Sequence, residues 1–267
     1  MDDELVIRSK DNRRLIYARS VRDGRESDLI FIEGKRQCLE AVRAKVEIEL
    51  CLLAESFDDR ETVAVLSSSA ASTVVVADRL FQGVAETKTP QGIIAIVRRP
   101  NGSPEQLLRS LSSASIPVIV FLYEVNNPAN LGGILRTVEA AGAGGVITST
   151  GSTDAFAPKS NRSALGANLR IPIWEKIETT EVLEFARQNS LQIAAAVVGD
   201  AVEYTSVEWK RPTLLMLGSE AHGLSRELVD YADLKISIPL MNDVESLNLS
   251  VSGGIILFEA LRQHRMV

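Results

Sequence analysis

Continuous apolar runs alternate with amphipathic stretches along the second half of the chain. The runs at 116–125, 191–198 and 213–218 contain few polar residues, so each strand is expected to be covered on both faces. Gly142 ends the helical pattern that follows the first run. Apolar strands that alternate with helices are typical of a mostly parallel sheet. The pattern therefore predicts an α/β domain over 116–267.

The same alternation occurs on a smaller scale in the first half. Apolar runs at 29–33, 46–53, 72–77 and 92–97 alternate with helical patterns. This arrangement predicts a small α/β domain over 1–100.

Residues that interrupt helices and strands mark the boundary between the halves. They are Pro100, Gly102 and Pro104. The short helical stretch "PEQLLRSLSS" follows, and residues 101–115 are predicted to form a linker.

Three loops rich in glycine, asparagine or serine follow predicted strands of the second domain. They cover 126–137, 218–225 and 241–254. Ligands of open parallel sheets bind beyond the carboxyl ends of the strands. These loops are therefore the candidates for a functional site.

The first loop combines a capping residue with glycines. Asn130 occupies a predicted helix N-cap, Gly132 and Gly133 allow close backbone approach, and Arg136 is expected to project from the first turns. A glycine-rich turn before a helix suggests dinucleotide binding. The G-x-G-x-x-G pattern is absent, however, which argues against a Rossmann dehydrogenase.

The second loop places Glu220 between Gly218 and Gly223. A carboxylate there could order the neighbouring backbone or accept a hydrogen bond from a ligand. His222 is one of two histidines, and no H-x-E or H-x-x-x-H spacing gives it metal-binding partners. We interpret it as a loop histidine without a catalytic role.

The third loop opens the last helical pattern with more small polar residues than a cap requires. They are Ser246, Asn248, Ser250 and Ser252, in alternation with apolar residues.

Taken together, the motifs "NPANLGGILRT", "LGSEAHGLS" and "IPLMNDVESLNLSVSGGIILFEALRQ" resemble those of the SpoU/TrmH branch of the SPOUT RNA methyltransferases. Members transfer a methyl group from S-adenosylmethionine to a ribose 2′-hydroxyl in ribosomal or transfer RNA. The N-terminal half is similar to the family's substrate-binding domain, through "FIEGKRQCLEAV" and "TKTPQGIIAIV".

The resemblance implies a deep trefoil knot in the C-terminal domain, with S-adenosylmethionine bound inside the knotted loops. Small residues would then lie where backbones cross, while Leu247, Leu249 and Val251 pack. The residues matching the family's functional polar positions are Asn130, Arg136, Glu220, Ser246 and Asn248. Those expected to bind the cofactor are Leu217, Gly218, Ile238, Leu240 and Leu247.

The resemblance also suggests roles for these side chains. Arg136 is sometimes considered the general base in the family, but an arginine is effectively always protonated. We therefore expect Arg136 to grip an RNA phosphate, with Glu220 bracing the site and the other polar residues orienting the hydroxyl. The family's glycine after the glutamate is replaced by Ala221. A positive φ there would cost roughly 1 kcal/mol or more.

Charge refines the expected partner. The net charge of −6 argues against a simple polyanion binder, yet residues 8–25 hold seven basic residues against two acidic ones. A solvated helix face would explain this patch as well as phosphate contacts would. The family's N-terminal domain resembles a small RNA-binding ribosomal protein, which favours RNA contact.

The remaining expectations follow from composition and from the resemblance. Cys38 and Cys51 form no metal or disulfide pattern, and no signal peptide or membrane-spanning run is present, which predicts a cytoplasmic protein without metal. The resemblance implies a homodimer and favours ribosomal over transfer RNA. A tRNA methyltransferase and a non-catalytic RNA-binding member are the alternatives.

Overall fold

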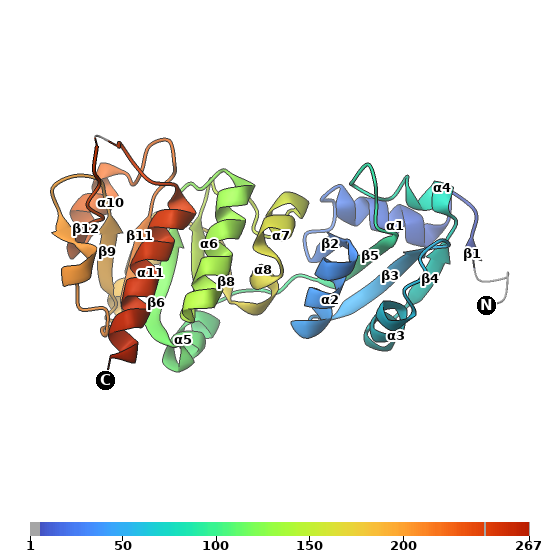
Figure 1. Ribbon diagram of the computed structural model, residues 1–267, viewed down its shortest axis with the longest axis horizontal. Helices are drawn as coiled ribbons and strands as arrows, with labels where there is room; N and C mark the ends of the chain where they lie inside the picture. The colour runs from blue at the N-terminus through green and yellow to red at the C-terminus, as the bar shows by residue number, and fades with distance from the viewer. Residues whose placement is uncertain (1–5, 243, 267) are drawn as a thin grey trace. The chain divides into compact units, whose positions relative to one another are not determined.

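The computed structural model describes residues 6–242 and 244–266, which form two compact units. Residues 1–100 and 156–169 belong to the first unit, and 101–155 with 170–267 belong to the second. The expectations drawn from residues 1–5 lie outside the described residues. Figure 1 shows a sheet with its own helices in each unit.

The first unit contains a five-stranded sheet in the order β1-β4-β3-β5-β2. Its strands are β1 (Val6–Ile7), β2 (Leu29–Glu33), β3 (Ile48–Ala54), β4 (Thr73–Val76) and β5 (Ile93–Arg98). Its helices include α1 (Arg13–Arg22), α2 (Lys35–Arg43), α3 (Arg60–Ser69) and α4 (Asp78–Phe81). β5 runs antiparallel to both of its neighbours, whereas β1, β4 and β3 are parallel. The small α/β domain predicted from the sequence is thus confirmed.

The second unit contains a seven-stranded sheet in the order β10-β12-β9-β11-β6-β7-β8, with every pairing parallel. Its strands are β6 (Ile116–Leu122), β7 (Ala143–Ser149), β8 (Ile173–Ile177), β9 (Gln192–Ala196), β10 (Val202–Glu203), β11 (Thr213–Leu217) and β12 (Leu234–Ser237). Its helices include α5 (Pro104–Ser113), α6 (Pro128–Ala141), α9 (Thr179–Gln188), α10 (Arg226–Tyr231) and α11 (Leu249–Arg265). The predicted mostly parallel α/β sheet is confirmed.

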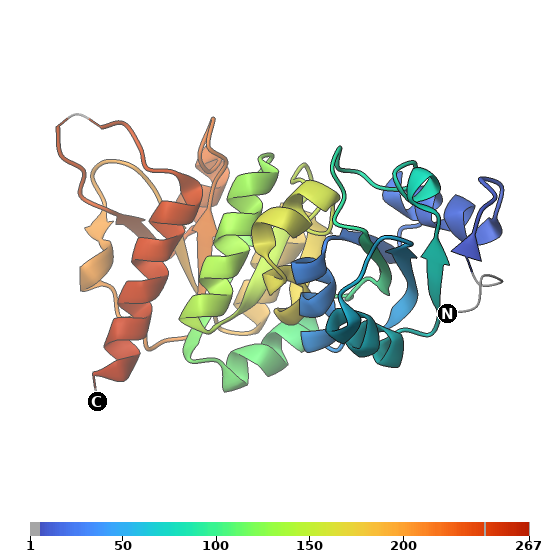
Figure 2. The ribbon, with the colours of Figure 1, turned by 45° about the vertical axis from the view of Figure 1, so that its right-hand side comes forward.

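Helices cover both faces of this sheet, as its continuous apolar strands predict. Leu107 of α5, Phe185 of α9 and Leu228 of α10 share one buried cluster with alternate residues of β6 and β11. Alternation along a strand sends the other set to the opposite face. There α6 and α11 lie side by side in front of β6 and β11 (Figures 1 and 2).

The start of α6 differs from the sequence-based prediction. Its N-cap is Asn127, whose side chain accepts from the Ala129 N–H at 2.9 Å, and Pro128 occupies the first helical position. Asn130 therefore lies inside the first turn instead of capping it, because proline is favoured at the position after a cap. The predicted end at Gly142 is confirmed, with φ +68° in the left-handed region.

The compact units divide the chain differently from the predicted domains. α5 packs on β6 and β7, so most of the expected linker belongs to the second unit. Residues 156–169, with α7 (Pro158–Ala164), pack in the first unit, where Arg162 pairs with Glu86 at 2.6 Å. The trefoil knot stays a prediction.

α6 and α11 approach each other closely because small residues face the contact. A Cβ added to Gly133 would lie 3.1 Å from the Ser250 side chain, and one on Gly253 would lie 2.3 Å from Ile134 Cδ1. A Cβ on Gly254 would meet Thr137 at an ordinary 3.6 Å. Of the two adjacent glycines, only Gly253 is required by packing.

We expect Gly253→Ala and Gly254→Ala to have opposite effects on stability. Alanine at 253 must displace the fully buried Ile134, and overpacking of this kind costs about 1–3 kcal/mol. Alanine at 254 has room and gains roughly 0.5–1 kcal/mol of helix propensity. Urea unfolding of both variants gives the comparison. Equal stability of the two would show that the α6–α11 contact is looser than described.

Candidate active site

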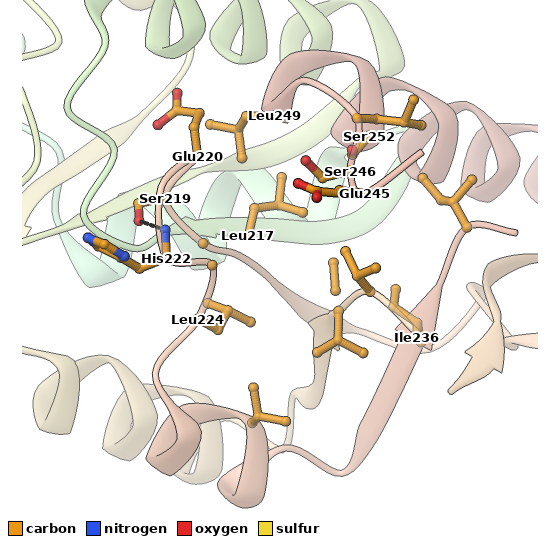
Figure 3. Close-up of a pocket in the computed structure, with 18 of the residues that line it drawn as sticks. Leu217, Ser219, Glu220, His222, Leu224, Ile236, Glu245, Ser246, Leu249 and Ser252 are labelled. Carbon is orange, nitrogen blue, oxygen red and sulfur yellow. Dashed lines mark hydrogen bonds between the residues drawn. The ribbon is translucent and has the colours of Figure 1, made fainter. Parts of the chain in front are cut away.

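A cavity of about 480 Å³ lies beyond the carboxyl ends of β9, β11 and β12. Figure 3 shows Leu217, Leu224 and Ile236 around it, with Glu245, Ser246 and Ser252 gathered on one side. All five residues expected to bind the cofactor line this cavity, namely Leu217, Gly218, Ile238, Leu240 and Leu247. The strand ends therefore bring together residues from two of the three candidate loops.

The loop after β11 turns so tightly that Gly218 tolerates no side chain. A Cβ there would lie 2.1 Å from the carbonyl carbon of Gly223 and 2.2 Å from the Leu224 nitrogen. Gly223 supplies the left-handed backbone of the turn, with φ +66°. Ala221 is not among the described residues with positive φ, so the strain expected there does not arise.

The cavity offers backbone donors that the protein does not use. Among the described residues, no hydrogen bond uses the backbone N–H of Gly218, Ile238 or Leu247. Partly buried N–H groups without a protein partner are uncommon. A polar ligand in the cavity would satisfy them.

A second cavity of about 560 Å³ adjoins the first. The two share the wall formed by Ser219, Glu220, Ala221 and His222. Glu124 and Asn130 line only the second cavity. Glu124 has φ +50°, an uncommon backbone for a non-glycine residue, and its N–H donates to Ser149 Oγ at 2.8 Å. Glu220 therefore stands where the two cavities meet.

Hydrogen bonds join the three candidate loops. Asn248 Nδ2 donates to Asn130 Oδ1 at 2.8 Å, and Asn130 Nδ2 donates to the Glu220 carboxylate. Each of these side chains comes from a different loop. Three of the five residues expected to be catalytic are thus in direct contact, although Asn248 itself lines neither cavity.

The other two expected catalytic residues lie outside this hydrogen-bonded group. Ser246 lines the first cavity, where its side chain is exposed. Arg136 lines neither cavity; it is exposed on α6, and its side chain forms no hydrogen bond or ion pair with a described residue. The structure does not bring Arg136 to the site, so its role stays a prediction.

Carboxylates dominate the charge of the two cavities. Glu124, Glu220 and Glu245 line them, and no Lys or Arg is among the described lining residues. Beside the second cavity, burial raises the pKa of the Tyr123 hydroxyl, and its hydrogen bond to Glu124 raises it further. A phosphate at this site would need a cation from elsewhere.

Two residues at the site, both named in the candidate loops, have positions that were not predicted from the sequence. His222 lines both cavities, and the hydroxyl of Ser250 donates to Asn248 Oδ1 at 2.6 Å. The N-x-S spacing of 248–250 is the sequence feature that could have revealed this cap. Val251, which was expected to pack, is instead 49% exposed, because it lies on the outer side of α11.

No group of three or more His, Cys, Asp or Glu within the described residues could hold a metal ion. Every helix in the described part of the chain is too short or too polar to cross a membrane.

The parallel sheet, with adjoining cavities at its carboxyl edge, defines an α/β protein of the class that binds ligands beyond the ends of its strands. The profile of the SpoU rRNA Methylase family matches residues 117–258, and the chain belongs to this family. An MRM3-like substrate binding domain matches residues 14–95.

Individual relatives match most of the chain. The 23S rRNA (guanosine-2′-O-)-methyltransferase RlmB of Shewanella oneidensis is 30% identical, covering 90% of this chain and 99% of its own. RlmB of Pseudomonas syringae is 32% identical over 79% of this chain and 86% of its own. An AdoMet-bound rRNA methyltransferase from Sinorhizobium meliloti superposes with a TM-score of 0.83, at 26% identity over 98% of both chains.

Proposed function

We propose that this protein transfers a methyl group from S-adenosylmethionine to a ribose 2′-hydroxyl of ribosomal RNA. The observation that carries the proposal is the contact of Asn248, Asn130 and Glu220 at the junction of two cavities. The first cavity has the volume and the lining expected of a cofactor site, and the second cavity is lined by Asn130 and Glu220. Two substrates that react with each other require such a junction.

The first cavity fits S-adenosylmethionine in volume and in chemistry. Its volume of about 480 Å³ lies within the usual range for small-molecule sites. Leu217, Leu240 and Leu247 offer apolar contact to an adenine ring. The unused N–H groups of Gly218, Ile238 and Leu247 offer the donors that a base and ribose accept from.

The protein's own residues then position the acceptor hydroxyl. When bound, S-adenosylmethionine would supply a methyl group on a sulfonium sulfur. The C–S bond would break as the C–O bond forms, which leaves a neutral thioether, and the hydroxyl proton would leave along the hydrogen bond that Glu220 accepts. Glu220 stands between the cavities and accepts the hydroxyl's hydrogen bond, while Asn130 holds Glu220 in place. Ser246 lines the first cavity, where we propose that it helps to orient the hydroxyl. Orientation of this kind supplies several kcal/mol of the barrier reduction.

We further propose that the protein works as a homodimer that pairs through α6 and α11. No Lys or Arg is among the described residues that line the cavities. The Arg136 side chain on α6 forms no hydrogen bond or ion pair with any described residue. Val251 and Phe258 on α11 are each 49% exposed and would be buried by a second copy. Arg136 of one copy would then grip the phosphate bound at the site of the other.

The first unit is proposed to hold the RNA. Arg8, Arg22 and Arg25 pair with carboxylates. Arg13 and Arg14 are exposed, and their guanidinium groups form no hydrogen bond or ion pair with a described residue, so they are available for phosphates. The match to a substrate binding domain supports this assignment.

The names of the relatives and the state of the cysteines support the choice of ribosomal RNA and of the cytoplasm. The relatives named above carry the name 23S rRNA methyltransferase, which favours ribosomal over transfer RNA. The cysteines Cys38 and Cys51 are free and buried, as expected in the reducing cytoplasm.

The proposed reaction is tested with labelled S-adenosylmethionine and unmodified 23S rRNA, with unmodified tRNA in parallel. We expect label in 2′-O-methyl nucleosides from the rRNA digest alone. Label from tRNA would replace the substrate class, and label on a base would refute the reaction. Cofactor binding without transfer to either RNA, or to assembling ribosomal subunits, would indicate a non-catalytic RNA-binding protein.

Removing the two unpaired arginines should weaken RNA binding in a salt-dependent way. Arg13→Gln with Arg14→Gln is expected to lower the slope of log affinity against log salt by roughly 1.5, because each phosphate contact contributes about 0.7–0.9. The control is Lys210→Gln with Arg211→Gln, which removes two exposed basic residues that are consecutive in the sequence and belong to the second unit. Equal loss in both variants would remove the special role of the patch.

An aspartate on the outer side of α11 should separate the dimer. Phe258→Asp is expected to give a monomer in light scattering at micromolar concentration, because a charge cannot be buried unpaired in an interface. Val65→Asp introduces the same charge at an exposed position of α3 and should leave the mass unchanged. A wild-type protein that is already monomeric would contradict the proposal.

A further inference from the structure

The hydrogen bonds between the three loops run in one direction, from donor to acceptor, along Asn248, Asn130 and Glu220. This direction is fixed at Asn248. Asn248 caps α11, and its Oδ1 accepts from the backbone N–H of Ser250 at 3.0 Å. The Ser250 hydroxyl donates to the same oxygen at 2.6 Å. A backbone N–H can only donate, so the atom of Asn248 that faces it must be oxygen.

This direction passes along the remaining links. With its oxygen held by Ser250, Asn248 presents Nδ2 to Asn130, and the 2.8 Å contact is a donation to Asn130 Oδ1. Asn130 then presents its own Nδ2 to Glu220. A side-chain amide has one oxygen and one NH₂ group, so neither amide can turn over without breaking a hydrogen bond.

The hydrogen bond from Asn130 determines that Glu220 acts as an acceptor. An NH₂ group of Asn130 faces its carboxylate, so the contacting oxygen is the acceptor of this hydrogen bond. The second oxygen accepts no hydrogen bond from a described residue, and Glu220 lines both cavities. A free acceptor therefore stands where the proposed ribose and cofactor meet.

We infer that the N-terminal cap of α11 sets the hydrogen-bond direction of the site, with Asn248 and Ser250 as positioning residues that make Glu220 an acceptor for the ribose hydroxyl. This inference rests on the proposed methyl transfer. The packing of α6 against α11 keeps the cap in place, since the Ser250 side chain fills the space beside Gly133. Asn248 thus acts without lining either cavity.

Asn248→Asp should reverse the donor and acceptor roles in the hydrogen bonds with Asn130 and Glu220, while it keeps the N-cap of α11. Aspartate caps helices as well as asparagine does, but its second oxygen accepts where Nδ2 donated. Asn130 must then turn its amide over and face Glu220 with oxygen, which drives the two oxygens apart. We expect kcat to fall by about tenfold or more, with the KM for S-adenosylmethionine within about twofold of the wild-type value.

Glu220→Gln is the second variant, and it should compensate for Asn248→Asp when the two are combined. In the otherwise native chain, glutamine would offer its oxygen to Asn130 and an N–H to the ribose, so kcat should fall. Combined with Asn248→Asp, its Nε2 donates to the turned Asn130 and its oxygen faces the ribose. The double variant is therefore expected to be about fivefold or more faster than Asn248→Asp alone. A merely structural role would make the two losses accumulate.

Asn127→Asp serves as the control for added charge. Asn127 lines the second cavity and caps α6, as Asn248 caps α11, but takes no part in the hydrogen-bonded chain. The loss in Asn248→Asp must exceed the loss in this control. Comparable losses, or a double variant no faster than Asn248→Asp, would overturn the inference.

Stability provides a second measurement that does not depend on the reaction. If the wild-type protein methylates no RNA, the proposed function fails by itself. The direction of the chain is then judged by urea unfolding, where the double variant should be more stable than the sum of the two single effects predicts. Strict additivity there would overturn the inference independently of the activity.

Discussion

The close approach of α6 and α11 is the constraint on which the site depends. Gly133 leaves room for Ser250, and Gly253 leaves room for Ile134, so the two helices meet with little side-chain volume between them. The loop that precedes α11 is thereby brought to the loop that precedes α6. A larger separation would carry Asn248 beyond hydrogen-bond range of Asn130, and Glu220 would lose its partner.

The distribution of charge separates the two tasks of the chain. Carboxylates line the cavities of the second unit, while unpaired arginines lie on α1 of the first. An acidic site attracts no polyanion by itself, so affinity for RNA has to come from other surfaces. The overall charge of −6 is consistent with a protein that uses a few placed cations instead of a general positive field.

The sequence predicted the sheet well because its strands are uniformly apolar. β6, β9 and β11 fall within their predicted runs, and the order of loops followed from the parallel arrangement. Less predictable were features that depend on tertiary contact. The packing of 156–169 in the first unit has no local signature, and the β8 strand is only partly buried, so its pattern is weak.

The candidate site was predictable in composition but not in geometry. The five expected cofactor residues all line one cavity, since motif positions follow strand ends. The cap of α6 was misplaced by three residues, because Asn127-Pro128 and Asn130 are all plausible starts. The exposed position of Arg136 could not be foreseen, as it depends on which side of α6 faces the sheet and α11.

The cavity proposed to hold the cofactor is lined by Gly218, Ile238 and Leu247, whose main-chain N–H groups have no partner among the described residues. Main-chain groups are common to every amino acid except proline, which lacks the N–H. Substitutions at Ile238 or Leu247 other than proline would therefore leave these N–H groups in place, whereas a side chain at Gly218 would clash with Gly223 and displace the turn. An inhibitor designed to bind through them would leave the organism few single substitutions by which to acquire resistance.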